Sequence, residues 1–220
     1  MQFTDYLTIP GEHALLLEGN AGVVEAHLTV PQGISPSYVA LLGHPHSLQG
    51  GTMNNKVVTT MARVFKELNI PSLRFNFRGV GQSAGVYDAG LGESDDLSLF
   101  MQQWQEQQPE KQFIFAGFSF GSYVAYRAAS RCPQAVLITV APPVHHYDYE
   151  ELEQDLSSWL IVQGDEDEVV PFHLVEQFVK QAPGPVLLLT FTQTSHFFHG
   201  KLIELKTALT DYLNQTLGLV

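Results

Sequence analysis

Ser119 stands in a sequence pattern that could make it a nucleophile. It lies between Gly117 and Gly121, after the apolar run 113–118 and before residues 122–131, which favour a helix. A serine on so sharp a strand-to-helix turn has strained backbone geometry and an exposed hydroxyl, and the residues two before and two after approach closely enough to require glycine. The amides and positive dipole end of the following helix would face any oxyanion formed there. The alternative is an ordinary glycine-rich turn, so the interpretation depends on the serine's partners.

A serine hydroxyl is a weak nucleophile that needs a general base, and the base needs a carboxylate to orient it. His196 is the candidate base because it follows the apolar strand predicted over residues 186–191. His199 is the competing histidine, but it lies at the start of the last predicted helix, where capping or a solvent-facing position explains it. The serine, the acid and the histidine then occur in that order, each at the end of a predicted strand.

Four acidic residues, 165–168, follow Gly164 and the strand predicted over residues 159–163. Such a run is usually a solvated loop, but here the chain becomes apolar again before the next helix, so the loop is held at both ends. Asp167 is the predicted orienting acid, because three residues past the glycine allow its side chain to turn back over the sheet. Asp165 is the alternative.

The oxyanion of a tetrahedral intermediate needs two backbone donors. The amide of Phe120, directly after the serine, is the first, and the second should come from the loop after the strand predicted over residues 38–42. In that loop Pro45 has no amide hydrogen, so the amide of His46 is the best placed donor. The side chains of His44 and His46 could instead bind a metal, but no carboxylate or cysteine lies nearby in the sequence, so we expect no metal site.

A glycine-rich segment, residues 78–84, superficially matches a dinucleotide-binding fingerprint that follows a strand. Further glycines at 85, 90 and 92 keep the chain in a loop instead of opening a helix, and no lone acid ends the following strand. We therefore expect no nicotinamide and no other cofactor.

Strands and helices alternate from residue 38 onward, and the strands are nearly continuous apolar runs. This is typical of an α/β fold with a mostly parallel sheet that has helices on both faces and binds ligands at the carboxyl ends of its strands. An antiparallel meander is expected before it. The predicted strands cover residues 3–9, 13–18, 22–30, 38–42, 72–77, 113–118, 135–140, 159–163 and 186–191. The predicted helices cover residues 54–68, 95–107 (with Ser94 as its cap), 122–131, 171–181 and 200–217.

Composition restricts the class of protein. The chain has 220 residues, 45% of them hydrophobic, which predicts a single domain over residues 1–220 with an ample core. A net charge of −12 without any basic run argues against nucleic acid or an anionic membrane as a partner. The single cysteine, Cys132, excludes an internal disulfide framework. Residues 1–10 lack the basic residues of a signal peptide and no apolar stretch reaches membrane-spanning length, so we expect a cytoplasmic protein.

Three groups of motifs together resemble the α/β-hydrolase superfamily. They are the serine turn 117–121, the acidic loop with its Gly164, Asp167, Val170 and Pro171, and the turn 195–198 that carries His196. The strings 44–56 and 74–83 resemble a narrower subgroup of small bacterial predicted hydrolases, related to dienelactone-hydrolase-like esterases and lacking a cap domain. The resemblance covers roughly residues 38–205.

The resemblance implies an eight-stranded, mostly parallel sheet and a catalytic triad. Ser119 would be the nucleophile, His196 the base and Asp167 the orienting acid, with the backbone amides of His46 and Phe120 forming the oxyanion hole. One departure is Asn76, which stands where the superfamily commonly has aspartate. That position is structural in the superfamily, so the change does not bear on catalysis.

Only about 18 residues, 141–158, connect the strands on either side of the usual cap position, too few for a lid. We therefore expect an open site acting on small carboxylic esters, lined by Phe118, His145, His146, Tyr147 and Phe197. A thioesterase, a peptidase and a non-catalytic binding or scaffold protein of the same fold are the alternatives. The expected partner is a small-molecule ester, and the expected state a monomer or homodimer.

Overall fold

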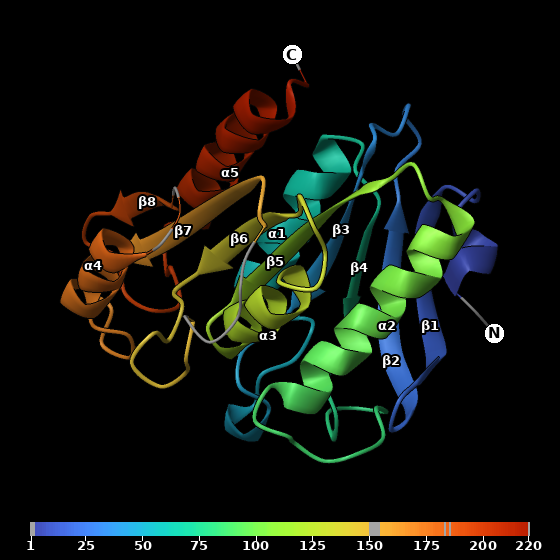
Figure 1. The fold of residues 1–220 in the computed structure, drawn as a ribbon, viewed down its shortest axis with the longest axis horizontal. Helices are drawn as coiled ribbons and strands as arrows, with labels where there is room; N and C mark the ends of the chain where they lie inside the picture. Colours follow the sequence, from blue (N-terminus) through green and yellow to red (C-terminus); the bar gives the residue numbers. More distant parts are fainter. Residues whose placement is uncertain (1–2, 150–154, 183, 185, 220) are drawn as a thin grey trace.

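One eight-stranded sheet carries the fold (Figure 1). The structure is a computed structural model and describes residues 3–149, 155–182, 184 and 186–219. The strands are β1 (Gly11–Gly19), β2 (Gly22–Val30), β3 (Tyr38–Gly43), β4 (Ser72–Phe75), β5 (Gln112–Phe118), β6 (Val136–Val140), β7 (Ser158–Gly164) and β8 (Val186–Phe191). Their order is β1-β2-β4-β3-β5-β6-β7-β8. Among these strands, the pairs β1–β2 and β2–β4 are antiparallel and the other five pairs are parallel, so the expected mostly parallel sheet is confirmed.

The central strands are buried on both faces, which explains why they are apolar without alternation. All residues of β6 are buried, as are all but the first of β3 and of β5. β3 and β5 pair in parallel register, with Leu41 opposite Phe115 and Gly43 opposite Gly117. This register brings the ends of both strands to the same edge of the sheet.

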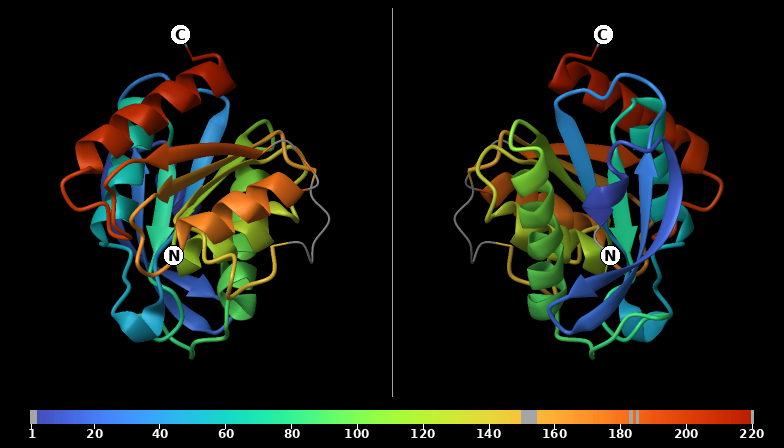
Figure 2. Two further views of the ribbon diagram at one scale, coloured as in Figure 1. Left: turned by 90° about the vertical axis from the view of Figure 1, so that its left-hand side faces the viewer. Right: turned by 90° about the vertical axis from the view of Figure 1, so that its right-hand side faces the viewer.

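Helices cover both faces of the sheet (Figure 2). α1 (Lys56–Glu67) and α5 (Leu202–Leu217) share one hydrophobic cluster with one face. α2 (Leu91–Gln107), α3 (Phe120–Ala129) and α4 (Phe172–Gln181) share the cluster on the other face. Between β6 and β7, the described residues 141–149 and 155–157 form neither helix nor strand, consistent with the absence of a cap. None of the helices described is long and apolar enough to cross a membrane.

One predicted element is wrong and another begins earlier than predicted. The strand expected over residues 3–9 is a 3₁₀ helix, Phe3–Tyr6, because Phe3 is buried against the rings of Phe100 and Trp104 on α2 instead of pairing in the sheet. α2 begins at Leu91, four residues earlier than predicted, so Ser94 lies inside the helix and does not cap it. The carboxylate of Glu93 accepts hydrogen bonds from the amides of Asp88 and Gly90, both at 2.9 Å, and so starts the helix inside the glycine-rich segment.

Candidate active site

The turn at Ser119 has the strained geometry expected for a nucleophile. Ser119 has φ 53° and ψ −124°, between the end of β5 and the start of α3. A Cβ on Gly117 would collide with the backbone of Gly121, and one on Gly121 would collide with the backbone of Gly43. The amide of Ser119 donates to the carbonyl of Val140 at 2.8 Å, which fixes the turn to β6. The close approach that requires glycine on both sides of the serine is therefore present.

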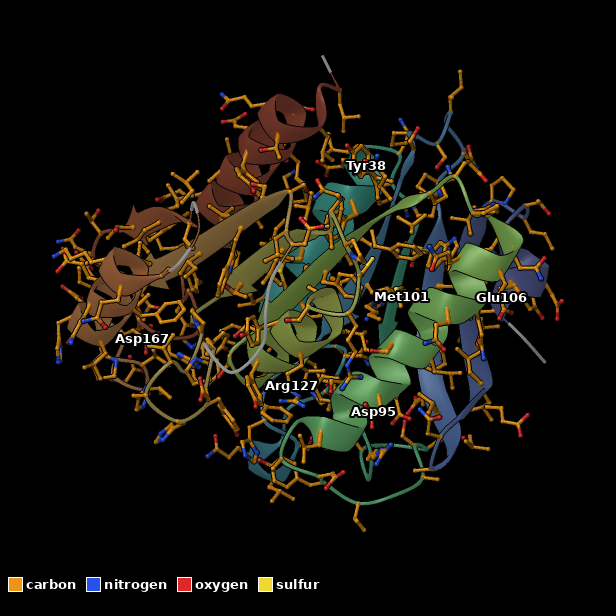
Figure 3. The ribbon with its side chains drawn as sticks, viewed as in Figure 1. Tyr38, Asp95, Met101, Glu106, Arg127 and Asp167 are labelled. Atoms are coloured by element: carbon orange, nitrogen blue, oxygen red, sulfur yellow. The ribbon has the colours of Figure 1, made fainter. Side chains whose placement is uncertain are left out.

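The structure brings Ser119, His196 and Asp167 together from the ends of β5, β8 and β7. The Nε2 atom of His196 lies 3.1 Å from Oγ of Ser119, and its Nδ1 atom lies 2.8 Å from Oδ2 of Asp167. All three residues are buried, with exposed fractions of 9%, 2% and 7% for the serine, histidine and aspartate. Figure 3 labels Asp167, beyond the end of β7 and beside α4. Hydrogen-bond contacts of this kind let an imidazole take a proton from the hydroxyl while the carboxylate orients it.

Asp165, the alternative acid, and His199, the alternative base, do not make the contacts that these roles require. The carboxylate of Asp165 accepts a long hydrogen bond, 3.4 Å, from the amide of Thr194 and does not contact the ring of His196. His199 is exposed at the turn that leads into α5. The geometry thus favours Asp167 and His196 over both alternatives.

Asp167 is held in its ionised form. Burial acts to raise its pKa, but the hydrogen bond with His196 and those from the amides of Val170 and Val169 outweigh burial, so the pKa of Asp167 is lowered. The side-chain amide of Gln163 donates a further hydrogen bond to Oδ2 at 3.0 Å. An ionised Asp167 keeps the proton of the neutral imidazole on Nδ1, which leaves Nε2 free to accept one from Ser119.

The acidic run beside Asp167 also holds the histidine loop, which its sequence did not reveal. The amide of His196 donates to Oε2 of Glu168 at 3.3 Å. The amide of Glu166 donates to the carbonyl of Thr194 at 3.2 Å, which adds to the contact between Thr194 and Asp165. The loop that carries the acid is therefore bonded at several points to the loop that carries the base.

The two predicted oxyanion donors lie at the ends of β3 and β5. Phe120 is the first residue of α3, and His46 precedes the short 3₁₀ helix Ser47–Gln49. Within the described ranges, neither backbone amide donates a hydrogen bond to a protein acceptor. Two unpaired amides next to a nucleophile can bind the oxygen of a tetrahedral intermediate.

Buried His44 fixes the loop that carries His46. Its Nε2 atom accepts the amide of Phe77 at 2.8 Å and its Nδ1–H donates to the carbonyl of Pro45 at 2.7 Å. Burial lowers the pKa of His44 to about 4, so this ring is neutral at pH 7. His44 thus has a structural role. The described residues contain no group of three or more side chains that could hold a metal ion.

A hollow of about 100 Å³ opens beside Ser119. Of the five residues predicted to line the site, only Phe197 lines this hollow. Phe118 is fully buried, with its ring centre 5.0 Å from that of His196 and 6.0 Å from that of Phe197, so it supports these two residues from below. The lining residues are Pro45, His46, Gln49, Gly50, Gly51, Asn55, Ser119, Val169, His196 and Phe197.

An aromatic cluster flanks Ser119 on the side of α3. Tyr147 stacks on Tyr123 with ring centres 4.5 Å apart and lies 5.6 Å from the ring of Phe120. Its hydroxyl lies 3.2 Å from that of Tyr87, whose ring stacks on His46 at 4.8 Å.

The other two predicted lining residues, His145 and His146, contact each other with ring centres 3.9 Å apart. Tyr87 lies in the loop after residues 78–84, where no sequence motif points to the site.

The departure at Asn76 has a structural reason. Its Oδ1 atom accepts the amide of Met53 at 2.9 Å, and its Nδ2 atom donates to Oε2 of Glu25 at 2.8 Å. An aspartate here would place a second carboxylate against Glu25. Asn76 therefore supports the segment before α1 without taking part in the contacts of Ser119.

Comparisons with known proteins identify relatives of this chain and of its fold. The family described as "Serine aminopeptidase, S33" matches residues 48–158. An α/β serine hydrolase homologue from Coxiella burnetii is 47% identical, covers 91% of this chain and 97% of its own, and superposes with a TM-score of 0.87. An α/β serine hydrolase without lid from Xanthomonas campestris is 40% identical, with 95% and 96% coverage and a TM-score of 0.89. An uncharacterized protein of Rickettsia prowazekii is 35% identical over 185 residues, 80% of this chain and 78% of its own.

Proposed function

Because the chain belongs to the α/β-hydrolase superfamily, we propose that it is a serine hydrolase that cleaves small carboxylic esters through an acyl-enzyme. The observation that carries the proposal is the pair of contacts made by His196, 3.1 Å to Oγ of Ser119 and 2.8 Å to Oδ2 of Asp167. Among the described residues, Ser119 is the only serine with a positive φ, and its partner His196 also contacts the carboxylate of Asp167.

The reaction has two halves. Oγ of Ser119 attacks the ester carbonyl carbon while Nε2 of His196 takes the hydroxyl proton, and Asp167 stabilises the imidazolium that forms. The carbonyl oxygen becomes an oxyanion that the amides of His46 and Phe120 bind. The C–O bond to the alcohol then breaks and His196 gives its proton to the alcohol oxygen. Water attacks the acyl-enzyme in the same way, which releases the carboxylic acid and restores Ser119.

Hydrolysis of p-nitrophenyl acetate and p-nitrophenyl butyrate tests this proposal. Wild-type protein should release p-nitrophenol with saturation kinetics, and Ser119→Ala should lower kcat by a factor of roughly 10³ or more, because no acyl-enzyme can form. Equal rates for the wild type and a folded Ser119→Ala variant would contradict it.

An aminopeptidase is the second candidate, favoured by the description of the family that matches residues 48–158. Amino-acid 4-nitroanilides distinguish the two. An aminopeptidase would cleave unblocked anilides faster than the corresponding N-acetylated ones, whereas the esterase proposed here would cleave neither at a rate comparable to the esters. A cytoplasmic location, a single domain over residues 1–220 and a monomeric or homodimeric state stay predictions.

A further inference from the structure

The groups around Ser119 determine how the oxyanion and the alcohol part of a bound ester are oriented. The oxyanion would face the amides of His46 and Phe120. The alcohol oxygen must face Nε2 of His196, because that atom returns the proton as the C–O bond breaks. The alcohol part of the substrate therefore leaves along the side of Ser119 on which His196 lies.

The hollow beside Ser119 lies on this side. His196, Phe197 and Val169 form one wall of it, and the loop of residues 45–55 forms the other. Its described wall does not include Tyr87 or Tyr147, which lie in the aromatic cluster. The aromatic cluster meets the hollow only at His46, whose ring stacks on Tyr87, so Tyr87 and Tyr147 lie outside the described wall.

The hollow is small. Gly50 and Gly51 form the middle of the loop wall, and a Cβ on Gly51 would collide with the backbone of Pro45. A volume of about 100 Å³ corresponds to roughly three waters at their share of liquid volume, which leaves room for an alkyl group of about three carbons. Longer groups would extend into solvent.

The hollow, within its described wall, also lacks permanently charged side chains. None of the described residues that line it is an aspartate, glutamate, lysine or arginine, although the chain carries a net charge of −12. The polar side chains on the loop wall are the imidazole of His46 and the amides of Gln49 and Asn55. Burial lowers the pKa of His46, so its ring is neutral at pH 7. Apart from the imidazolium that forms on His196 during the reaction, a charged leaving group would lose water there without finding a counter-charge.

We propose that this hollow is the leaving-group subsite and that the protein acts on esters of short, uncharged alcohols, with Val169 setting the length limit. This inference rests on the proposed function. In the step concerned, the acyl group stays on Oγ of Ser119, the C–O bond to the alcohol breaks, and the proton on Nε2 of His196 goes to the alcohol oxygen. Val169 can be varied because its contact with Asp167 is made by its backbone amide, and the residue is 43% exposed.

A series of acetate esters that differ only in the alcohol tests the length limit. For the wild type, kcat/KM should rise about fourfold per methylene from methyl to propyl acetate and then level off at butyl and hexyl acetate. Val169→Phe should move the levelling point to a shorter alcohol because the larger ring fills the hollow. Val169→Ala should move it to a longer one. Leu187→Phe, at an exposed apolar position on β8, is the matched control and should leave the series unchanged.

A pair of esters of equal size tests the charge. 2-Carbamoylethyl acetate and 2-carboxyethyl acetate differ only in an amide against a carboxylate, and the amide ester should have the higher kcat/KM by about tenfold. Equal kcat/KM values for this pair would overturn the subsite. So would a kcat/KM that rises steadily up to hexyl acetate, or a levelling point that neither Val169 variant moves. These results presuppose turnover that Ser119→Ala abolishes. Absence of turnover for every ester would instead overturn the proposed function and this inference with it.

Discussion

The backbone amide of His196 donates a hydrogen bond to Oε2 of Glu168 at 3.3 Å. The residue next to the candidate acid therefore holds the candidate base, and it does so through the backbone instead of through the imidazole. Because the imidazole must stay within hydrogen-bond reach of Ser119, a small displacement of this loop would reduce catalysis.

Removal of this contact should lower kcat with little change in KM. Glu168→Ala leaves the amide of His196 without its acceptor, and a lost hydrogen bond of about 1 kcal/mol corresponds to an approximately fivefold lower kcat. Glu168→Gln keeps an acceptor oxygen and should restore most of the rate.

Glu166→Ala is the control for Glu168, because Glu166 contacts the histidine loop only through its backbone. Steady-state kinetics with p-nitrophenyl acetate measures all three variants. An equally low kcat for Glu168→Gln and Glu168→Ala would assign the effect to charge instead of positioning.

The pH dependence of the unfolding free energy should show the contribution of buried His44. Burial lowers its pKa to about 4, against about 6.5 for an ordinary histidine in an unfolded chain. Between these values the unfolded chain binds a proton that the folded chain does not, so the unfolding free energy falls as pH falls through this window, by about 2–3 kcal/mol from His44. The lowered pKa of Asp167 acts at lower pH, below the ordinary range of a carboxyl group.

Urea unfolding at pH 7.0, 6.0, 5.0 and 4.5 measures this dependence. His44→Gln should be less stable than the wild type at pH 7, yet its unfolding free energy should fall less steeply between pH 7.0 and 4.5. Parallel curves for the two proteins would exclude His44 as the group responsible.

Asn76 and Glu25 should show strong coupling. Asn76→Asp removes the donor to Oε2 of Glu25 and places two carboxylates side by side, which should lower the unfolding free energy by about 1–3 kcal/mol. Adding Glu25→Gln restores a donor and should recover most of this loss. Denaturant unfolding of the wild type, both single variants and the double variant gives the coupling free energy. A value near zero would show that the contact between the two side chains does not stabilise the protein.

The sequence predicts which residues meet at Ser119, because each of them lies just after a strand of the sheet. Parallel strands end at one edge of the sheet, so the spacing of Asp167 and His196 from their strands was enough to bring them together with Ser119. The residues that line the site could not be predicted in this way. Gln49, Gly50 and Tyr87 lie in loops whose path depends on distant contacts, such as the hydrogen bond between His44 and the amide of Phe77.

Local patterns fail where tertiary packing overrides them. The first residues resemble a strand by composition, but the burial of Phe3 against α2 turns them into a 3₁₀ helix. Phe118 is close to Ser119 in sequence and was expected to line the site. As the last residue of β5 its side chain lies beneath His196 instead, which stabilises the ring that contacts the nucleophile.

Labelling with a fluorophosphonate, followed by intact-mass measurement, tests most directly whether Ser119 is an activated nucleophile. Wild-type protein should gain one adduct, Ser119→Ala should gain none, and His196→Ala should react more slowly by a factor of roughly 10²–10⁴, because the hydroxyl then lacks its base. A wild-type protein shown to be folded that gains no adduct would contradict the account, as would an adduct that persists in Ser119→Ala.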